Sequence, residues 1–266
     1  MVLALCRCCV VISIHICLLV GFFLAVPLMH FKFKNKEYTF KTKAVPLLAF
    51  LVSLSILLGL STWQFKRLKW KSNLIDIRIS MYEGEVRPLK VLNKPSKLEF
   101  QKISVKGKLL NEYEFYMPAL SKNGNNGYHI LVPFKTDENK FIVFDTGWVP
   151  LLKKDRDKRI NNIDNEEKEF VAVIRIPGRK GYFQPENDPL KNFWFFVEPT
   201  LMEKQLKFSL EKNFYLEAVN NGPNGFPLGN QTRIYLRNNH LQYALTWLMI
   251  ALGLVGVYFF SSIKKK

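Results

Sequence analysis

Two long apolar segments without a charged residue constrain the fold more than any other feature of this sequence. One runs from Ala44 to Thr62, and the other runs from Leu241 to Ile263 near the C-terminus. A helix needs roughly 20 apolar residues to cross the hydrocarbon core of a bilayer, and both segments are about this long. We therefore predict transmembrane helices at residues 44–63 and 241–263, which flank one extramembrane domain at residues 64–240.

Residues 1–31 form an additional hydrophobic segment that has two interpretations. The run Val10–Met29 is apolar apart from Ser13 and His15, which is compatible with a third span. No pattern of small residues typical of a cleavage site follows, so a cleaved signal peptide fits poorly. Alternatively, Met29 is the true start, because the basic residues after it are typical of the leader before a first transmembrane helix. Both interpretations stay open.

Lysine clusters predict how the two spans are oriented. Lysines precede the first span and follow the second one at Lys32, Lys34, Lys36, Lys41, Lys43, Lys264, Lys265 and Lys266. Basic residues close to the ends of spans favour the cytoplasmic side of the membrane. We therefore expect a multi-pass protein of the cell inner membrane, with the main domain facing the periplasm and the C-terminus in the cytoplasm.

The net charge of +17 does not indicate a nucleic-acid-binding protein. Part of the surplus belongs to the lysines beside the spans. Within the extramembrane domain the basic residues are interspersed with acidic ones, and no nucleic-acid motif accompanies them. A lysine-rich, solvated surface that is weakly attracted to anionic lipid headgroups accounts better for this composition.

The extramembrane domain carries no signature of an enzyme. The phosphate-binding, zinc-protease and serine-hydrolase motifs are absent from the sequence. All cysteines precede residue 18, so the domain has no thiolate nucleophile and no cysteine-based zinc site. His129 lies in a strand pattern, where a core or surface role is the default, and Asp188 lies in a turn pattern without a catalytic partner. We therefore predict that the protein is not an enzyme.

After Pro95 the apolar residues form short runs rich in Val, Ile, Phe and Tyr, separated by Asn, Gly, Asp and Pro. This pattern favours an α+β domain built on an antiparallel barrel or sandwich over alternating strand–helix units. The charged stretch Lys153–Lys168 predicts a solvated loop or a frayed helix, and Pro199–Glu211 predicts one short helix. The expected strands are Lys102–Leu110, Glu114–Pro118, Gly127–Phe134, Lys140–Gly147, Glu169–Ile176, Asn192–Val197, Asn213–Val219 and Thr232–Leu236.

A helix is expected to leave the first span with aromatic and basic residues on one face. Trp63, Arg67 and Trp70 follow one another at i, i+4 and i+7, and the amphipathic pattern continues to about Met81. The guanidinium of Arg67 is suited to binding a carboxylate through two hydrogen bonds. The alternative is a snorkelling arginine between interfacial tryptophans, which gather at membrane boundaries whatever the function.

His240 precedes the second span directly, at the expected boundary between water and lipid. Tyr243 and Trp247 follow three and seven positions later, so an imidazole and two aromatic rings share one helical face. Histidine is a frequent metal ligand, and such a face is suited to a flat ligand. The alternative is that His240 is a polar boundary residue and that the rings are interfacial anchors.

Four local patterns resemble one protein family when they are taken in order between the two spans. They cover about Ala44 to Ile263 and resemble the Surfeit locus protein 1 family of cytochrome c oxidase assembly factors. Thr146 departs from this family, which usually has arginine before Gly-Trp-Val-Pro, and the N-terminal hydrophobic run lies outside the family pattern. The patterns are Trp63-Gln64-x-x-Arg67-x-x-Trp70-Lys71, Gly127-Tyr128-His129-x-x-x-Pro133 before Gly147-Trp148-Val149-Pro150, Phe183-x-Pro185-x-Asn187-Asp188-Pro189 before Trp194, and Asn239-His240-Leu241-Gln242-Tyr243-Ala244-x-Thr246-Trp247.

The resemblance implies a membrane protein that helps haem-copper oxidase to mature while haem a enters the catalytic subunit. It implies transient binding of haem a, with His240 as an axial ligand of the haem iron. From the helical faces we infer that Trp63, Tyr243 and Trp247 surround the macrocycle and that Arg67 lies near a propionate. The expected partners are the catalytic subunit, other assembly factors and membrane lipid. The alternative is a membrane scaffold that holds an oxidase assembly intermediate by protein contacts alone.

Overall fold

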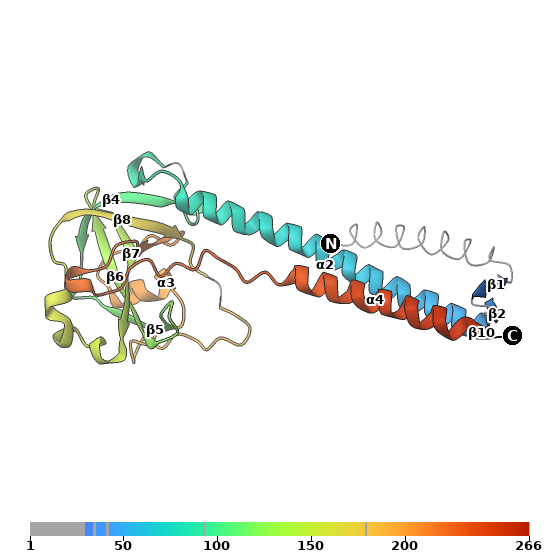
Figure 1. Ribbon diagram of the computed structural model, residues 1–266. Coiled ribbons are helices and arrows are strands. Elements are labelled where there is room, and N and C mark those ends of the chain that lie inside the picture. The colour runs from blue at the N-terminus through green and yellow to red at the C-terminus, as the bar shows by residue number, and fades with distance from the viewer. Residues whose placement is uncertain (1–29, 34–35, 41–42, 93, 179, 266) are drawn as a thin grey trace. The chain divides into compact units, whose positions relative to one another are not determined.

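The structure is a computed structural model that describes residues 30–33, 36–40, 43–92, 94–178 and 180–265 (Figure 1). The described residues form two units. Those up to Leu74 and from Arg237 onward make up the helix-pair unit, and Ile75–Leu236 make up the barrel unit. The additional helix expected within the first 31 residues falls outside the described residues, apart from His30 and Phe31.

Two long helices dominate the helix-pair unit. Helix α2 spans Ala44–Glu83 and helix α4 spans His240–Ser262. Each is long and apolar enough to cross a membrane, which agrees with the two predicted spans. Pro46 lies in the first turn of α2, where its missing N–H interrupts no helical hydrogen bond. Because α2 runs on without a break to Glu83, the expected continuation to about Met81 is confirmed.

The two helices pack through small and aromatic residues at matching heights. Ala244, Ala251 and Tyr258 recur every seven residues along α4, so they lie on one face of that helix. The ring of Tyr258 stacks on Phe50 of α2 with the centroids 4.2 Å apart. Nearer the other end, the Ser61 hydroxyl of α2 donates to the Ala244 carbonyl at 3.0 Å. The alanines allow this close approach because they have little side chain to separate the backbones.

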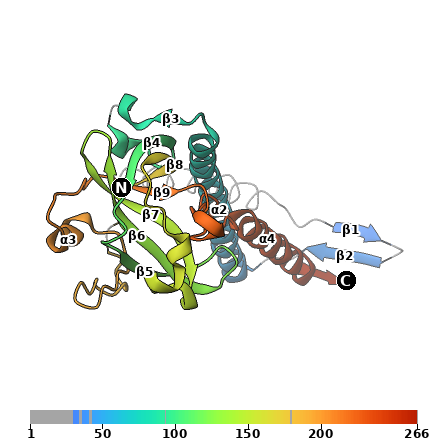
Figure 2. The same ribbon diagram turned by 90° about the vertical axis from the view of Figure 1, so that its left-hand side faces the viewer.

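A small antiparallel sheet joins the two free ends of the helix pair. Strands β1 (His30–Phe33) and β2 (Lys36–Phe40) form a hairpin, and β10 (Ile263–Lys265) pairs with β2 (Figure 2). Since β2 precedes α2 and β10 follows α4, the start of α2 and the end of α4 lie at the same end of the unit. The lysine-rich segments outside both helices are therefore neighbours.

The barrel unit is built on a sheet whose strand order is β3-β4-β8-β9-β7-β6-β5. An additional pairing of β4 with β6 closes the middle of this sheet, so β4, β8, β9, β7 and β6 form a five-stranded barrel (Figures 1 and 2). The expectation of a β-rich domain is confirmed, and of its two forms the barrel is the observed one. The strands are β3 (Arg87–Pro88), β4 (Lys102–Leu109), β5 (Phe115–Leu120), β6 (Asn126–Thr136), β7 (Phe141–Pro150), β8 (Lys168–Arg175) and β9 (Tyr215–Ala218).

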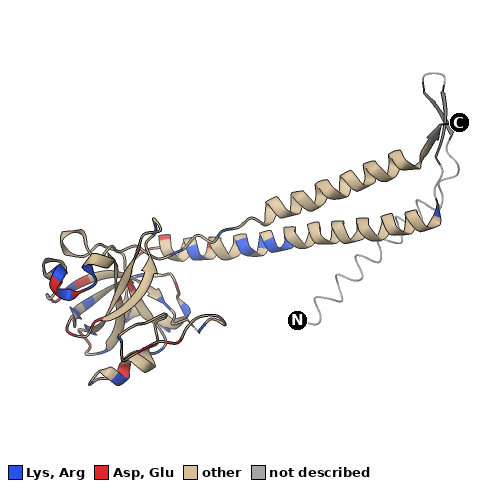
Figure 3. Cartoon of the chain, turned by 90° about the horizontal axis from the view of Figure 1, so that it is seen from below, with Lys and Arg blue, Asp and Glu red and all other residues tan. Residues whose placement is uncertain are grey.

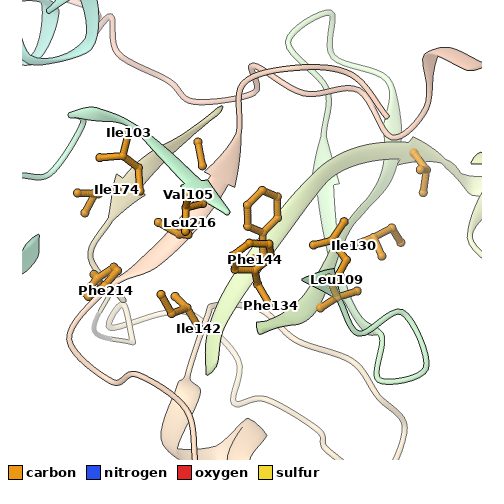
Figure 4. Close-up of a cluster of buried hydrophobic side chains, with 13 residues drawn as sticks. Ile103, Val105, Leu109, Ile130, Phe134, Ile142, Phe144, Ile174, Phe214 and Leu216 are labelled. Carbon is orange, nitrogen blue, oxygen red and sulfur yellow. The ribbon is translucent and has the colours of Figure 1, made fainter. Parts of the chain in front are cut away.

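Apolar residues at alternate strand positions fill the barrel (Figure 4). Alternation follows from the pleat, which turns successive side chains to opposite faces. Phe134 and Phe144 meet at the centre with ring centroids 5.3 Å apart. Gly107 leaves room for Phe134, because a Cβ at this position would lie 2.7 Å from the Phe134 ring and 2.2 Å from the Lys135 carbonyl oxygen. The inward-facing residues include Ile103, Val105, Leu109, Ile130, Val132, Ile142, Ala172, Ile174 and Leu216.

Two of the predicted strands are wrong, and the predicted short helix is confirmed over only part of its range. Asn192–Val197 forms only isolated bridges through Phe193, and Thr232–Leu236 is an extended segment without ladder pairing. The second segment alternates like a strand because Thr232 and Ile234 are buried while the residue that follows each of them is exposed. Within Pro199–Glu211, α3 covers only Pro199–Met202, and a short 3-10 turn follows it. Other 3-10 turns lie at Leu89–Val91, Pro95–Lys97, Leu151–Lys153, Arg156–Asn162 and Pro223–Gly225.

The composition of the charged stretch Lys153–Lys168 predicted that it is solvated, but part of it is buried. Its 3-10 turn buries Arg159 and Asn162. The Arg159 guanidinium binds the carboxylate of Glu114, and both side chains are almost fully buried. The Asn162 amide donates to the Pro223 carbonyl at 2.6 Å. A composition pattern cannot reveal such partners, because they come from distant parts of the chain.

Candidate functional site

His240 is the first residue of α4, and its ring is tied to α2. The Nδ1 atom lies 2.7 Å from Oε1 of Gln64. An amide oxygen only accepts hydrogen bonds, so in this orientation of the amide Nδ1 carries the proton and donates it. The other ring nitrogen, Nε2, is then the unprotonated one and is available as a metal ligand. The side chain is half-buried, so the site is neither sealed in a core nor fully solvated.

Two further hydrogen bonds between α2 and the α4 region hold this level of the helix pair. Ser61 donates to the Ala244 carbonyl one turn into α4, as described above. Just before α4, the Asn238 amide donates to the Ser72 hydroxyl at 3.3 Å. The hydrogen bond between His240 and Gln64 lies between these two contacts. Gln64 comes between Ser61 and Ser72 in the sequence, and His240 comes between Asn238 and Ala244. These two contacts therefore hold α2 and the α4 region together on either side of the hydrogen bond between His240 and Gln64.

The structure brings Tyr243 and Trp247 to the same side of α4 as His240. At about 100° per residue, Trp247 lies within about 20° of His240 around the helix axis, and Tyr243 within about 60°. Trp247 is half-buried and Tyr243 is exposed. An imidazole and two rings therefore line one side of α4, beginning at its first residue.

Trp63 and Arg67 are placed differently. Ser61 marks the side of α2 that faces α4, and Trp63 follows it by about 200° around the helix. Trp63 is 49 % exposed and Trp70 is 54 % exposed, which fits a position away from α4. The Arg67 guanidinium is 4.8 Å from the centre of the Trp70 ring. Trp63, Arg67 and Trp70 therefore share the outer side of α2, whereas Gln64 is the residue of this turn that reaches His240.

Sequence reasoning missed Gln64 as part of the site. The residue was visible in the motif Trp63-Gln64, but nothing in its type distinguishes a functional amide from a solvated one. Its role depends on α4 packing against α2 at this height, which is a tertiary contact between residues 176 positions apart in the sequence.

His129 has surroundings that differ from those of His240. It is buried on β6, and its Nδ1 donates to Oδ2 of Asp145 on β7 at 2.6 Å. The register of β6 and β7 shifts between His129 and Leu131, so that His129 is opposite Trp148 and Leu131 is opposite Asp145. Burial by itself would lower the pKa of His129, but the charge and hydrogen bond of Asp145 outweigh it and raise the pKa. The second Asp145 oxygen accepts from the Gly147 N–H at 2.9 Å.

The polar row of His129 continues across the outer face of the sheet. Glu217 on β9 is paired in register with Asp145, and the Thr232 hydroxyl donates to its carboxylate. Burial raises the pKa of Glu217, and the charge of Asp145 raises it further, against the opposing charge of Arg175. This row fastens the extended segment around Thr232 to the barrel. Within the described part of the chain, no group of three or more His, Cys, Asp or Glu side chains is arranged to hold a metal ion.

Two cavities of the barrel unit are lined by residues other than the predicted site residues. The larger one has a volume of about 820 Å³ and lies beside the ion pair of Lys90 and Asp137, whose atoms are 2.5 Å apart. A smaller one of about 170 Å³ is lined by Thr146 and the buried Arg159. At Thr146, the hydroxyl donates to the Ile130 carbonyl at 2.9 Å. Threonine therefore satisfies its own polar group at this position.

Comparison with known proteins places the chain in one family. The model of the SURF1 family matches residues 51–252. Surfeit locus protein 1 of Takifugu rubripes is 30 % identical over 225 residues, which cover 78 % of this chain and 92 % of that protein. The human protein of the same name is 30 % identical and covers 71 % of this chain and 68 % of its own length.

A bacterial relative agrees with this assignment. The SURF1-like protein of Rickettsia bellii (strain RML369-C) is 31 % identical over 227 residues, covering 82 % of this chain and 89 % of that protein. All four motifs of the sequence analysis, from Trp63 to Trp247, lie inside the segment that the family model matches. The resemblance inferred from these motifs is therefore confirmed, and the chain belongs to the SURF1 family, a family of cytochrome c oxidase assembly factors.

Proposed function

We propose that this chain assists the assembly of cytochrome c oxidase by binding haem a through His240 and passing it to the catalytic subunit. The observation that carries the proposal is the hydrogen bond from His240 Nδ1 to Gln64 Oε1. Metal-bound histidines usually donate their other ring N–H to such an acceptor, which fixes the tautomer and the ring orientation. His240 is already arranged in this way.

The surroundings of His240 fit a flat apolar group with an iron centre. Haem would supply the iron for axial ligation and a macrocycle that gains from contact with apolar rings. Trp247 and Tyr243 offer such rings on the same side of α4. Partial exposure suits a carrier, because a ligand that is handed on must leave without unfolding the site. The roles of Trp63 beside the macrocycle and of Arg67 at a propionate stay predictions, since both side chains lie on the outer side of α2.

In this proposal the protein resides in the cell inner membrane, with the barrel unit in the periplasm and the C-terminus in the cytoplasm. The pairing of β2 with β10 supports it, because the lysine-rich ends of both helices then lie at one end of the helix pair. Clusters of lysine next to spans favour the cytoplasmic side.

The direct test is co-expression of the full chain with the enzymes of haem a synthesis, followed by purification in detergent. We expect an absorption spectrum of bound haem for the unchanged protein and its loss in His240→Ala. Circular dichroism should show that the variant keeps its helix and strand content. Gln242→Ala is the matched control, because Gln242 is an exposed residue two positions further along α4. Equal haem content in His240→Ala and the control would reject His240 as the ligand.

A specific observation favours a second candidate function, the scaffold without haem. Tyr182 and Phe183 are each 94 % exposed, and Leu190 is 99 % exposed, all on the excursion between β8 and α3. The base of this excursion is fixed, since the Gln184 amide donates to the Phe195 carbonyl at 2.8 Å. Rigidly presented aromatic residues are typical anchors of protein–protein contacts.

The two functions are separated by co-purification of the oxidase catalytic subunit from cells that lack haem a synthesis. A scaffold would retain the subunit, would lose it in a Tyr182→Ser, Phe183→Ser double variant, and would be indifferent to His240→Ala. A haem carrier would lose the subunit when haem a is absent, whatever the residues at positions 182 and 183.

A further inference from the structure

We propose that the outer side of α2 is a binding site for the headgroup of an anionic phospholipid, formed by Trp63, Arg67 and Trp70. This role is separate from the haem site at His240. It concerns the side of α2 that turns away from α4, and it commits to a membrane lipid as the occupant.

The first step is the charge of this part of α2. Four cations, Lys66, Arg67, Lys69 and Lys71, follow the apolar segment within two helical turns, and no acidic residue occurs in α2 before Asp76. Figure 3 shows the basic residues as a cluster along this helix. A cluster of cations at the end of a membrane helix attracts anionic lipid, at about 1 kcal/mol for each Lys or Arg near the surface.

The second step is that no carboxylate of the described residues neutralises Arg67, Lys69 or Lys71. Within the part of the chain that the structure describes, Arg67, Lys69 and Lys71 make no ion pair with a carboxylate. The contact recorded for the Arg67 guanidinium is with the Trp70 ring. That contact holds the guanidinium against α2 but leaves its N–H groups without an anionic partner.

The third step is the combination of cation and aromatic ring at one height. Trp63 and Trp70 are seven residues apart, which is about 10 Å along the helix, and Arg67 lies midway between them on the same side. Tryptophan prefers the level of the headgroups, with its ring partly in the apolar region. A guanidinium between two such rings is suited to bind a phosphate oxygen through paired hydrogen bonds.

The same geometry argues against the haem propionate as the partner of Arg67. Trp63 and Trp70 lie on the side of α2 opposite to Ser61, which is one of the residues that contact α4. A haem held by His240 would lie next to α4, whereas the guanidinium of Arg67 is held on the outer side by Trp70. The anion that reaches it most directly is a lipid headgroup of the surrounding leaflet.

The test uses the full chain reconstituted in phosphatidylcholine vesicles in which a minor fraction of the lipid is brominated. In one series the brominated lipid is phosphatidylglycerol, and in the other it is phosphatidylcholine. Bromine quenches tryptophan fluorescence on contact, so stronger quenching by brominated phosphatidylglycerol reports its enrichment around the tryptophans next to the bilayer, which are Trp63 and Trp70 on α2 and Trp247 on α4. The contribution of α2 is the part of this preference that the α2 variants remove. We expect this preference in the unchanged protein, and a loss of about fivefold in relative affinity for each charge removed in Arg67→Gln, Lys69→Gln.

The matched control is Lys204→Gln, Lys207→Gln, which removes two exposed lysines from the barrel unit and should keep the preference. Arg67→Lys in place of Arg67→Gln should preserve most of it, because the charge stays. Equal quenching by the two brominated lipids in the unchanged protein would overturn the proposal, as would a preference that survives in the Arg67, Lys69 double variant. A double variant that loses haem a but keeps its lipid preference would assign Arg67 to a propionate instead.

Discussion

The two histidines His129 and His240 have opposite environments in the two units of this protein. His129 is buried in the barrel unit and bound to a carboxylate, so its charge is compensated and both partners are locked in the sheet. His240 is half-buried at the start of a helix and bound to the neutral amide of Gln64. The residue type alone therefore does not indicate function. What matters is whether the partner is a carboxylate that neutralises the charge of the imidazole or a neutral group that only orients the ring.

The largest expected effect comes from removing the buried histidine. His129→Ala leaves the Asp145 carboxylate buried without its partner, and breaking a buried pair in this way costs roughly 3–5 kcal/mol of unfolding free energy. His240→Ala removes one partly exposed hydrogen bond, which costs about 1 kcal/mol. Urea unfolding of the full chain in detergent, followed by tryptophan fluorescence, measures both. Equal destabilisation by the two variants would contradict the assignment of a structural role to His129 and not to His240.

The next effect concerns the residue that orients His240. Gln64→Ala leaves the ligand atom in place but frees the ring, and loss of such a partner typically lowers metal affinity 10- to 100-fold. Titration of the purified variant with haem a, read by absorption, measures the affinity. Gln242→Ala should bind as the unchanged protein does. If Gln64→Ala also binds normally, the hydrogen bond to His240 has no part in ligation.

The pH dependence of stability tests the buried side of the comparison. His129 and Glu217 both have pKa values above their ordinary ones, so the folded barrel unit holds more protons than the unfolded chain. Their contributions are fully present below the unfolded pKa values and are lost as the pH rises through the folded ones. We expect Tm to fall with rising pH above the ordinary range of glutamate and again above that of histidine. The free energy of unfolding should drop by about 1.4 kcal/mol for each unit of pKa shift.

His129→Gln should abolish the upper part of this decline and leave the lower part, which belongs to Glu217. The measurement is a series of thermal unfolding curves of the full chain across neutral pH. A Tm that rises with pH in this range would contradict the assignment of protons to the folded state.

The smallest expected effect distinguishes the two sides of the helix pair. Trp247→Phe alters a ring on the His240 side of α4 and should weaken haem a binding by a few-fold, about 1 kcal/mol, as is usual for an aromatic contact. Trp63→Phe alters a ring on the outer side of α2 and should leave haem binding unchanged. Haem titrations of both variants decide this. A larger effect at Trp63 would restore the sequence-based prediction that this ring contacts the macrocycle.

Most of the fold was predictable because it depends on local patterns. The two helices follow from uncharged apolar length, and six strands of the barrel unit follow from alternation between turn residues. The errors arose where alternation reflects burial without pairing, as at Thr232–Leu236. Another error was the prediction of a solvated stretch around Arg159, which is in fact buried because it forms an ion pair with the distant Glu114. For the site, sequence placed His240, Tyr243 and Trp247 on one side of α4, because helical spacing fixes that relation.

The sequence by itself determined the two helices that are long and apolar enough to cross a membrane, the β-rich character of the intervening domain, and the motifs that mark the family. Each of these features depends on residues that are close together in the sequence. Only the tertiary structure decided that the sheet closes into a barrel, that Gln64 rather than Trp63 reaches His240, and that Asp145 compensates His129. The physical reason is that a helix period fixes which residues share a side, but the packing of two helices decides which side becomes the interface. In a sheet, likewise, alternation fixes which residues share a face, but the pairing of the strands decides which buried charged groups interact.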